Sequence, residues 1–254
     1  MVLTSDNGGY VKGEKGPCNT TTGTDGGPNT DVGHGTVCFN GEAGANNWPQ
    51  RGGKYSNFEG GIRVNAFVSG GYLPASARGT KVDGMIHVAD WYGTLSRLVG
   101  VDPVDPVANA AGLPPPDSVN VWDLVTGRNA TSPRTSVLVT KDLLVTTRWK
   151  YALPHTKMIE SEWGGPIYPN ASTATDPIDA HAFKCPATGC LFDLENDPHE
   201  REEVSAQHPR VVKRLRAELE RQAKGIWKTD HKRDPACREY AWAHGGFLQP
   251  WIDV

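Results

Sequence analysis

The sequence predicts an α/β protein with a small antiparallel sheet in its second half. Three observations favour this class: short stretches that are typical of strands, one amphipathic helix in the first half, and a second amphipathic helix near the end. The stretches typical of strands lie at residues 1–4, 62–68, 136–140, 143–152 and 190–194. We expect an α/β portion over residues 1–125 and a smaller α+β portion over residues 126–254.

The first helix is expected between residue 85 and Gly100. Apolar side chains recur there at steps of three and four residues, which places them on one face of a helix. They are Met85, Val88, Tyr92, Leu95 and Val99. Gly100 can end the helix. Proline-rich sequence then forms a connector, and residues 119–124 are expected to form a short turn or helix that packs on the α/β portion.

The second helix, expected to be the final one, begins near Pro209 and ends before Gly225. Val212, Leu215, Leu219 and Gln222 lie on one stripe of this helix. Glu220 and Lys224 have the spacing of a surface ion pair, which contributes roughly 0.3 kcal/mol. A stripe of this kind predicts that the helix covers one face of the small sheet.

A Gly-rich segment at residues 10–45 is almost free of large apolar side chains and rich in Thr, Asn and Asp. Such a composition is typical of a long surface loop or insertion. Met1-Val2-Leu3 leads directly into a polar loop, so this chain shows no signal peptide.

Composition narrows the possible partners. Hydrophobic residues make up 37% of the chain and charged residues 22%, which are values of a globular protein. The net charge of -3 argues against a nucleic-acid partner. The sequence contains no run of about 20 apolar residues, so no membrane span is expected.

Two short motifs carry the candidate chemistry. Asp6 and Asn7, in the run Ser5-Asp6-Asn7-Gly8-Gly9, offer oxygen ligands that suit calcium or magnesium. The alternative is a simple Asx turn. Lys54 precedes the run from Phe58 to Arg63, and its ammonium suits a tetrahedral oxyanion such as a sulfate or phosphate ester. The alternative for Lys54 is a solvated surface charge.

Two further pairs of charged residues are expected to be structural. Glu59 and Arg63 are interpreted as a supporting ion pair beside Gly60 and Gly61, which would permit a positive φ or a close backbone approach. His87 and Asp90 lie three residues apart near a helix start, and capping is a better interpretation than acid–base catalysis.

These motifs resemble the arylsulfatases, and among them the arylsulfatase B branch. The matching stretches follow the order of the family along the chain. They are residues 5–9, 46–49, 51–52, 54, 58–63, 87–95, 190–200 (the "LFDLxxDPxE" element) and 245–251.

The resemblance implies the carboxyl-terminal part of a sulfatase (alkaline-phosphatase-like) α/β domain, followed by its small carboxyl-terminal subdomain. It implies hydrolysis of sulfate monoesters, with a sulfated small molecule or a sulfated glycan as substrate. In that family pattern, Asp6 and Asn7 bind Ca²⁺ together with two upstream aspartates, and Lys54 binds the sulfate and acts in catalysis.

The resemblance also shows a missing part. Sulfatases of this type use a formylglycine made from a cysteine in a Cys-x-Pro/Ala-x-Arg motif, and none of the five cysteines here fits that motif. Cys185 is nearest, but Gly189 stands where the arginine should be. We therefore expect the second half of a sulfatase that is inactive alone, with Met1 an internal methionine and the true amino terminus missing.

Cysteines and glycosylation sequons favour a lysosomal or secreted parent protein. Cys185 and Cys190 could close a small loop, and Cys18 and Cys38 bracket a segment that a disulfide could close. Cys237 is left over, and we expect its partner in the absent half. The alternative is five reduced thiols in a cytosolic protein. The sequons, which are glycosylation candidates, are at Asn19, Asn129 and Asn170.

Two alternative functions stay open from the sequence. The first is a related metal-dependent phosphodiesterase or phosphatase of the same superfamily. The second is a non-catalytic sulfatase-like module that binds sulfated glycans or a partner chain.

Overall fold

A computed structural model describes residues 1–9, 45, 47–156, 158, 183–227 and 236–246. The chain divides into one unit over Met1–Lys224 and a second unit over Gly225–Val254. The predicted boundary between residues 125 and 126 stays a prediction. Outside the described residues lie most of the Gly-rich segment and four candidate residues, namely Cys18, Asn19, Cys38 and Asn170.

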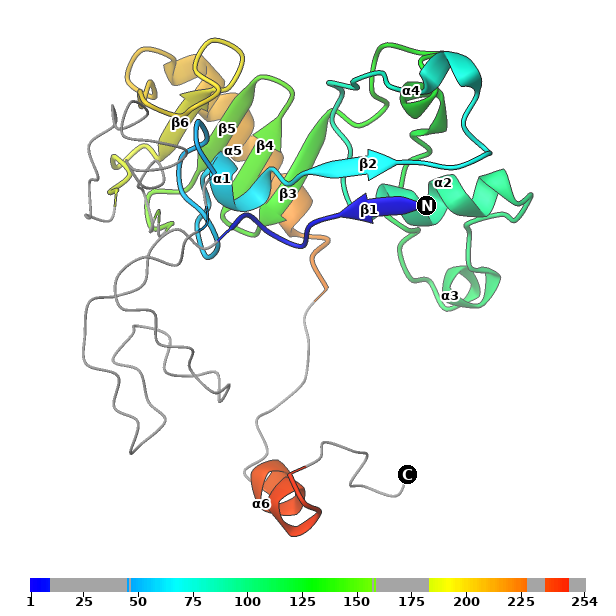
Figure 1. Cartoon of the computed structure of the whole chain (residues 1–254). Coiled ribbons are helices and arrows are strands. Elements are labelled where there is room, and N and C mark those ends of the chain that lie inside the picture. The colour runs from blue at the N-terminus through cyan, green and yellow to red at the C-terminus, as the bar shows by residue number, and fades with distance from the viewer. Residues whose placement is uncertain (10–44, 46, 157, 159–182, 228–235, 247–254) are drawn as a thin grey trace. The chain divides into compact units, whose positions relative to one another are not determined.

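The first part of the chain contains a two-stranded sheet and several short helices (Figure 1). Strand β1 pairs antiparallel with β2, with Leu3 opposite Phe67. The strand expected at 62–68 starts late because a short helix precedes it. The elements are β1 (Val2–Thr4), α1 (Glu59–Ile62), β2 (Ala66–Val68), a 3₁₀ helix (Ala75–Ala77), α2 (Asp90–Leu98), α3 (Pro106–Ala110) and α4 (Trp122–Val125).

Helix α2 confirms the first predicted helix, although it begins at Asp90. The buried Asp90 carboxylate accepts the backbone N–H of His87 at 2.8 Å and that of Val119 at 3.0 Å, and it forms an ion pair with Arg134. These contacts fix the helix start, and they confirm that His87 and Asp90 act structurally. The short helix α3 was not predicted. Asp105 caps it by accepting two backbone N–H groups.

The apolar stripe of α2 faces outward in this chain. Val88, Tyr92, Leu95 and Val99 are 67%, 53%, 47% and 75% exposed. The opposite side of the helix is the buried one, where the Gly93 N–H donates to Ser118 Oγ at 2.7 Å. Because a single face of an amphipathic helix is normally the buried one, α2 presents an apolar surface with no described cover.

The second part is a four-stranded antiparallel sheet in the order β3-β4-β5-β6 (Figure 1). The strands are β3 (Ser136–Thr140), β4 (Leu143–Thr146), β5 (Trp149–Ala152) and β6 (Cys190–Asp193). The stretch expected as one strand at 143–152 is two strands joined by a tight turn. Thr146 Oγ1 fixes this turn by accepting the Trp149 N–H at 2.9 Å and donating to the Trp149 carbonyl at 3.1 Å.

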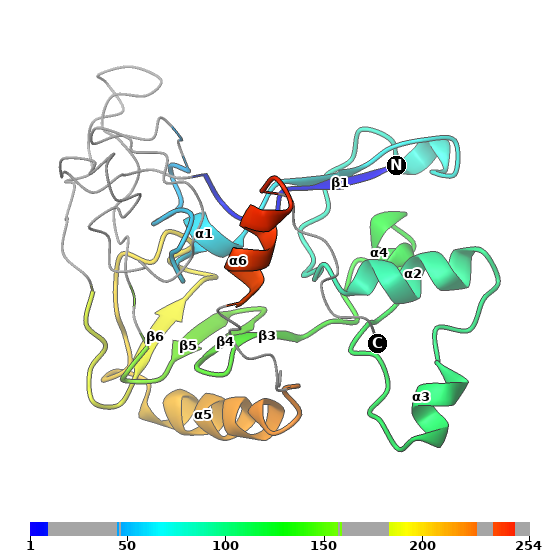
Figure 2. The ribbon, with the colours of Figure 1, turned by 90° about the horizontal axis from the view of Figure 1, so that it is seen from below.

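Both faces of this sheet are covered. Helix α5 (Pro209–Ala223) lies along one face (Figure 2). Its residues Val212, Leu215 and Leu219 pack against Leu144, Trp149, Tyr151 and Leu191. The other face meets the segment before α1, where Phe58 packs against Leu143, Ala152, Met158, Cys190 and Phe192. Successive strand residues point to opposite faces, so β5 alternates between these two clusters.

The helix α5 confirms the predicted stripe but not the predicted ion pair. Glu220 accepts from Arg216 Nε at 3.0 Å, so its described partner precedes it on the helix instead of following it. A further helix, α6 (Ala236–Ala243), lies in the second unit, so the helix expected to be final is not the last one. Cys237 is in α6, but its side chain is outside the described residues.

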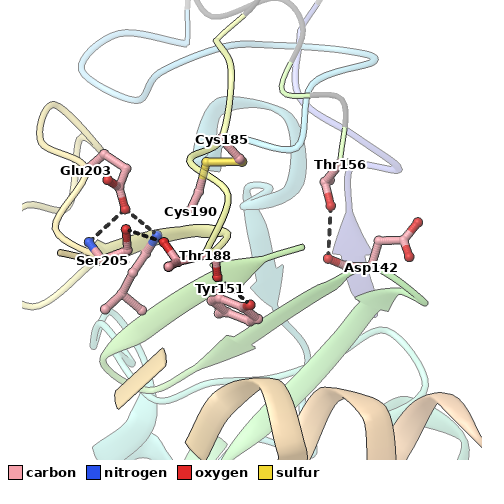
Figure 3. The surroundings of a disulfide bond; sticks show 9 residues. Asp142, Tyr151, Thr156, Cys185, Thr188, Cys190, Glu203 and Ser205 are labelled. Atoms are coloured by element: carbon pink, nitrogen blue, oxygen red, sulfur yellow. Dashed lines mark hydrogen bonds between the residues drawn. A yellow bond between two sulfur atoms is a disulfide. The ribbon is translucent and has the colours of Figure 1, made fainter. Parts of the chain in front are cut away.

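The predicted Cys185–Cys190 pair is a disulfide, with its Cα atoms 4.9 Å apart (Figure 3). It closes the turn that leads into β6. The Tyr151 hydroxyl donates to the Thr188 carbonyl at 2.9 Å, which attaches the same turn to β5. Gly189 has φ +94°, and a Cβ there would lie 2.5 Å from the Ala152 carbonyl oxygen, so the turn requires glycine.

Candidate functional site

The candidate metal ligands Asp6 and Asn7 follow β1 directly. Asp6 is exposed and Asn7 is half-buried. The next residue, Gly8, donates its N–H to the Gly61 carbonyl at 2.9 Å. This bond attaches the segment after β1 to the end of the Glu-Gly-Gly motif, which lies in α1.

Lys54 lies in the loop before α1, and its N–H donates to the Gly9 carbonyl at 3.0 Å. The Asn47 side chain supports the same junction. Its Oδ1 accepts the Gly9 N–H at 2.9 Å, and its Nδ2 donates to the carbonyls of Gly9 at 2.8 Å and Gly52 at 3.1 Å. The structure therefore brings the segments that carry Asp6, Asn7 and Lys54 together, although they are far apart in the sequence.

Glycines make this close approach possible. A Cβ on Gly8 would lie 1.6 Å from the Gly60 carbonyl oxygen, and a Cβ on Gly60 would lie 2.2 Å from that of Gly52. A Cβ on Gly61 would lie 2.4 Å from the carbonyl oxygens of Gly53 and Ser56. Of the two reasons predicted for the paired glycines, close backbone approach is therefore the one that applies.

The donor atoms of Asp6 and Asn7 fit a hard cation in type but not in number. Asp6 Oδ1 accepts the Asn7 N–H at 2.9 Å, and Asn7 Nδ2 donates to the Gly8 carbonyl at 2.7 Å, which leaves the amide oxygen as its acceptor. Calcium takes about 6–8 oxygen ligands. Within the described part of the chain, no group of three or more His, Cys, Asp or Glu side chains could hold a metal ion. These two residues would therefore supply only part of a calcium site.

The Lys54 side chain is half-buried. Its Nζ lies 5.5 Å from the centroid of the Tyr55 ring, within the range of a cation–π contact. Tyr55 is 60% exposed and has φ +74°, a backbone conformation that is uncommon outside glycine. The ammonium therefore lies beside an exposed ring, on a residue whose backbone N–H bonds to Gly9.

A buried charged cluster lies behind the Lys54 loop. Lys150 of β5 is fully buried, and its Nζ lies 2.8 Å from Glu59 Oε1 and 2.7 Å from Glu200 Oε1. It also donates to the Asn57 carbonyl at 3.1 Å. The ammonium therefore has one hydrogen bond and two ion-pair contacts, although Glu200 Oε1 accepts no hydrogen bond of good geometry. We call Lys150, Glu59 and Glu200 the buried triad.

Glu200 holds the triad to the backbone of the Lys54 loop. It has φ +56°, and its Oε2 accepts the Glu59 N–H at 2.5 Å. Its carbonyl accepts from Arg51 Nη1 at 2.8 Å. The Arg51 guanidinium lies 4.2 Å from the Phe58 ring centroid, which gives this charge an apolar support.

Burial determines the charge state of the triad. Desolvation, together with the neighbouring Glu59 carboxylate, raises the pKa of Glu200 to about 7, although Lys150 opposes the shift. The pKa of Lys150 is also raised, because the two carboxylates outweigh the effect of its own burial. The burial of Glu200 therefore makes its carboxylate less favourable near neutral pH than that of an exposed glutamate.

The predicted Glu59–Arg63 ion pair is wrong, because the Glu59 carboxylate pairs with Lys150. The sequence contains a signal for this contact. Lys150 is a single cation inside the run Trp149-Lys150-Tyr151-Ala152, and a lysine in a buried strand requires a buried carboxylate partner. Sequence spacing cannot say which carboxylate that is.

Among the predicted glycosylation candidates, Asn129 lies on an exposed loop after α4. Its Oδ1 accepts the Thr131 N–H at 2.9 Å. None of the helices in the described ranges has the length and apolar character needed to cross a bilayer.

The fold, with a sheet covered on both faces and a lysine loop joined to the end of β1, is that of the carboxyl-terminal part of a sulfatase. The chain is related to the sulfatases. It is 28% identical to arylsulfatase J of Mus musculus over 236 residues, which cover 82% of this chain and 37% of the relative. It is 29% identical to an N-acetylgalactosamine-6-O-sulfatase of Bacteroides thetaiotaomicron over 175 residues, which cover 67% of this chain and 29% of the relative.

Two solved structures share the fold. One is a Bacteroides thetaiotaomicron protein described in connection with the metabolism of multiple glycosaminoglycans, with 24% identity, a TM-score of 0.52, and coverage of 88% of this chain and 38% of the other. The other is the PsFucS1 sulfatase from Pseudoalteromonas sp., with 20% identity, a TM-score of 0.51, and coverage of 90% and 38%. No protein-family model matches the chain. The chain thus spans between 29% and 38% of the length of these relatives.

Proposed function

We propose that the chain is the carboxyl-terminal part of a sulfuric ester hydrolase that cleaves sulfate monoesters. Lys54 binds the sulfate group and stabilises the departing oxyanion. Asp6 and Asn7 supply part of a Ca²⁺ site. The substrate class is a sulfated small molecule or a sulfated glycan, and the parent protein is lysosomal or secreted.

One observation carries this proposal. The Lys54 N–H bonds to the Gly9 carbonyl, and Gly8 bonds to Gly61, so a cation-bearing loop and an oxygen-donor pair meet at one junction. A metal ion and a lysine that face one tetrahedral anion can share its negative charge. The relation to arylsulfatase J and to an N-acetylgalactosamine-6-O-sulfatase favours sulfate over phosphate as that anion.

The exposed apolar surfaces support the proposal that further protein completes the fold. Leu3 on β1 and Phe67 on β2 are 46% and 50% exposed, and the outer stripe of α2 is exposed as well. A two-stranded sheet is only marginally stable on its own in water. In a complete sulfatase-like fold these surfaces would be buried, and the same added protein would supply the nucleophile and the remaining metal ligands.

Two assays test the proposal. Purified residues 1–254 should not hydrolyse nitrocatechol sulfate, because none of the five cysteines has the sequence context of a formylglycine. Measurable turnover by this chain would contradict the assignment of the nucleophile to additional sequence.

The second assay uses a longer polypeptide in which this chain follows a segment with a Cys-x-Pro/Ala-x-Arg motif. Lys54→Ala should lower kcat/KM by about a hundredfold or more, as expected when a group that stabilises the transition-state charge is removed. Lys81→Ala is the matched control, because Lys81 is a surface lysine whose side chain is 84% exposed. Near-normal turnover of the Lys54 variant would refute its role.

A further inference from the structure

The buried triad holds both ends of the segment that carries Lys54. At one end, Arg51 Nη1 donates to the Glu200 carbonyl at 2.8 Å. At the other end, the Glu59 N–H donates to Glu200 Oε2 at 2.5 Å, and Lys150 Nζ donates to the Asn57 carbonyl at 3.1 Å. Lys54 lies between these attachment points.

We propose that Lys150 and Glu200 are positioning residues, which hold the segment from Arg51 to Glu59 in the conformation that places Lys54 against Gly9, close to Asp6 and Asn7. The inference rests on the proposed function only for what Lys54 then does. It assigns to the small sheet a direct effect on the candidate site, because Lys150 belongs to β5 and Glu200 follows β6.

Contacts between charged and hydrogen-bonding groups depend on orientation, whereas contacts between apolar side chains do so much less. Burying charges costs several kcal/mol per ion before any pairing, so a buried ion pair is weak evidence for stability. An ammonium with a hydrogen bond to the Asn57 carbonyl and two carboxylate oxygens at 2.8 and 2.7 Å, however, restricts where its partners can lie. An apolar side chain at position 150 would allow the loop to slide across the sheet.

The charge balance makes this positioning depend on pH. Among the described residues, the charged groups beside Glu200 are Lys150 from β5, Glu59 from α1, and Arg51 from the loop, which donates to the Glu200 backbone carbonyl. When Glu200 is neutral, Lys150 and Glu59 form a balanced pair. When Glu200 is ionised, the triad contains two carboxylates and one ammonium, and both Glu200 oxygens face donors, namely Lys150 Nζ and the Glu59 N–H. The environment of the loop should therefore change over the pH range in which Glu200 changes its charge.

The test is the amide NMR spectrum of residues 1–254, which requires neither substrate nor metal. Glu200→Ala should move the amide signals of Lys54 and Gly8 by more than a linewidth, because their bonds to Gly9 and Gly61 are disturbed. The amides of Leu215 and Leu219, in α5 on the opposite face of the sheet, should keep their positions.

Glu203→Ala is the matched control. The Glu203 carboxylate accepts the N–H groups of Leu191 and Ser205, as Figure 3 shows for Ser205, and these bonds do not reach the lysine loop. This variant should leave the Lys54 and Gly8 signals in place. Glu200→Gln resembles the protonated carboxyl, so its spectrum at pH 5.5 and at pH 8 should match that of the wild-type chain at pH 5.5.

The wild-type titration keeps the inference testable if Glu200→Ala does not fold. The Lys54 and Gly8 amides should shift between pH 5.5 and pH 8 together with the amide of Glu59. If Lys54 and Gly8 stay fixed while Glu59 moves, or if no signal moves in either experiment, the positioning role is overturned. If the Lys54 and Gly8 amides shift as expected but Lys54→Ala keeps full activity, the role of Lys54 in the proposed function is refuted and the positioning role of the triad stands.

Discussion

Replacing Glu200 with glutamine should prevent a loss of stability that the wild-type chain undergoes as the pH rises to neutral, although the substitution removes a partner from a buried ion pair. The folded-state pKa of Glu200 is raised from 4.5 to about 7, mainly because its carboxyl is fully buried. A group with a raised folded pKa contributes its stability below the unfolded pKa and loses it as the pH rises through the folded pKa. The wild-type chain should therefore lose stability between about pH 4.5 and pH 7.

The magnitude follows from the size of the shift. Each pKa unit corresponds to about 1.4 kcal/mol, so the shift of Glu200 amounts to on the order of 3 kcal/mol. Glutamine is neutral at every pH and its amide oxygen can still accept the Glu59 N–H, but its NH2 group then faces Lys150 Nζ, which lies 2.7 Å from Glu200 Oε1 in the wild-type chain. The free energy of unfolding of the Gln variant, relative to the wild-type chain, should therefore rise by about 3 kcal/mol between pH 4.5 and pH 7.

The assay is urea denaturation across this pH range, with the free energy of unfolding compared between variant and wild type at each pH. Other groups whose charge changes in this range cancel in the difference, because the variant and the wild-type chain both contain them. Glu218→Gln serves as the control, because the Arg221 guanidinium lowers the pKa of Glu218 to about 2, outside the window. Parallel profiles for the Glu200 variant and the wild type would refute the reasoning.

Three further variants, one of them with a control, test the packing around the sheet and the site. Leu219→Ala should cost about 2–5 kcal/mol of unfolding free energy, because the side chain is 1% exposed against the sheet; a loss below 1 kcal/mol in urea denaturation would contradict this packing. Replacing both Cys185 and Cys190 with serine should lower the free energy of unfolding by about 2 kcal/mol, because the disulfide closes a short loop. Under reducing conditions the wild-type chain loses the same disulfide, so the thermal melting temperatures of variant and wild type should then agree. Gly8→Ala should destabilise the chain strongly, whereas Gly71→Ala, whose added Cβ meets nothing within 4 Å, should change denaturation little; equal effects would argue against the close backbone contact.

The small sheet and α5 could be predicted because their signals are local. Alternating and continuous apolar runs marked β3 to β6, and a stripe at helical spacing marked α5. The turn inside the stretch 143–152 was not predicted, because Thr146 and Trp149 are ordinary strand residues and a side-chain hydrogen bond makes the turn. The disulfide was predicted for the same local reason, since its cysteines are five residues apart.

The candidate site was only partly predictable. The motif residues Asp6, Asn7 and Lys54 were identified by resemblance, and the structure joins their segments through Gly8 and Gly9. The triad was not predicted, because its backbone contact joins residues 141 positions apart. Periodicity gives the face of a helix or strand but not the partner across it, which is also why the outward orientation of the α2 stripe could not be foreseen.

The exposed apolar stripe of α2 has opposite consequences for the solubility of the purified chain and for its association with further protein. An exposed apolar side chain such as Val99, which is 75% exposed, favours self-association of the purified chain. The open edge of the β1–β2 strand pair favours it as well. Charged replacements on the α2 face would reduce that self-association. In the proposed longer protein they would also place ions in the interface that covers this face, so a variant improved for purification would be a poor one for testing the proposed activity.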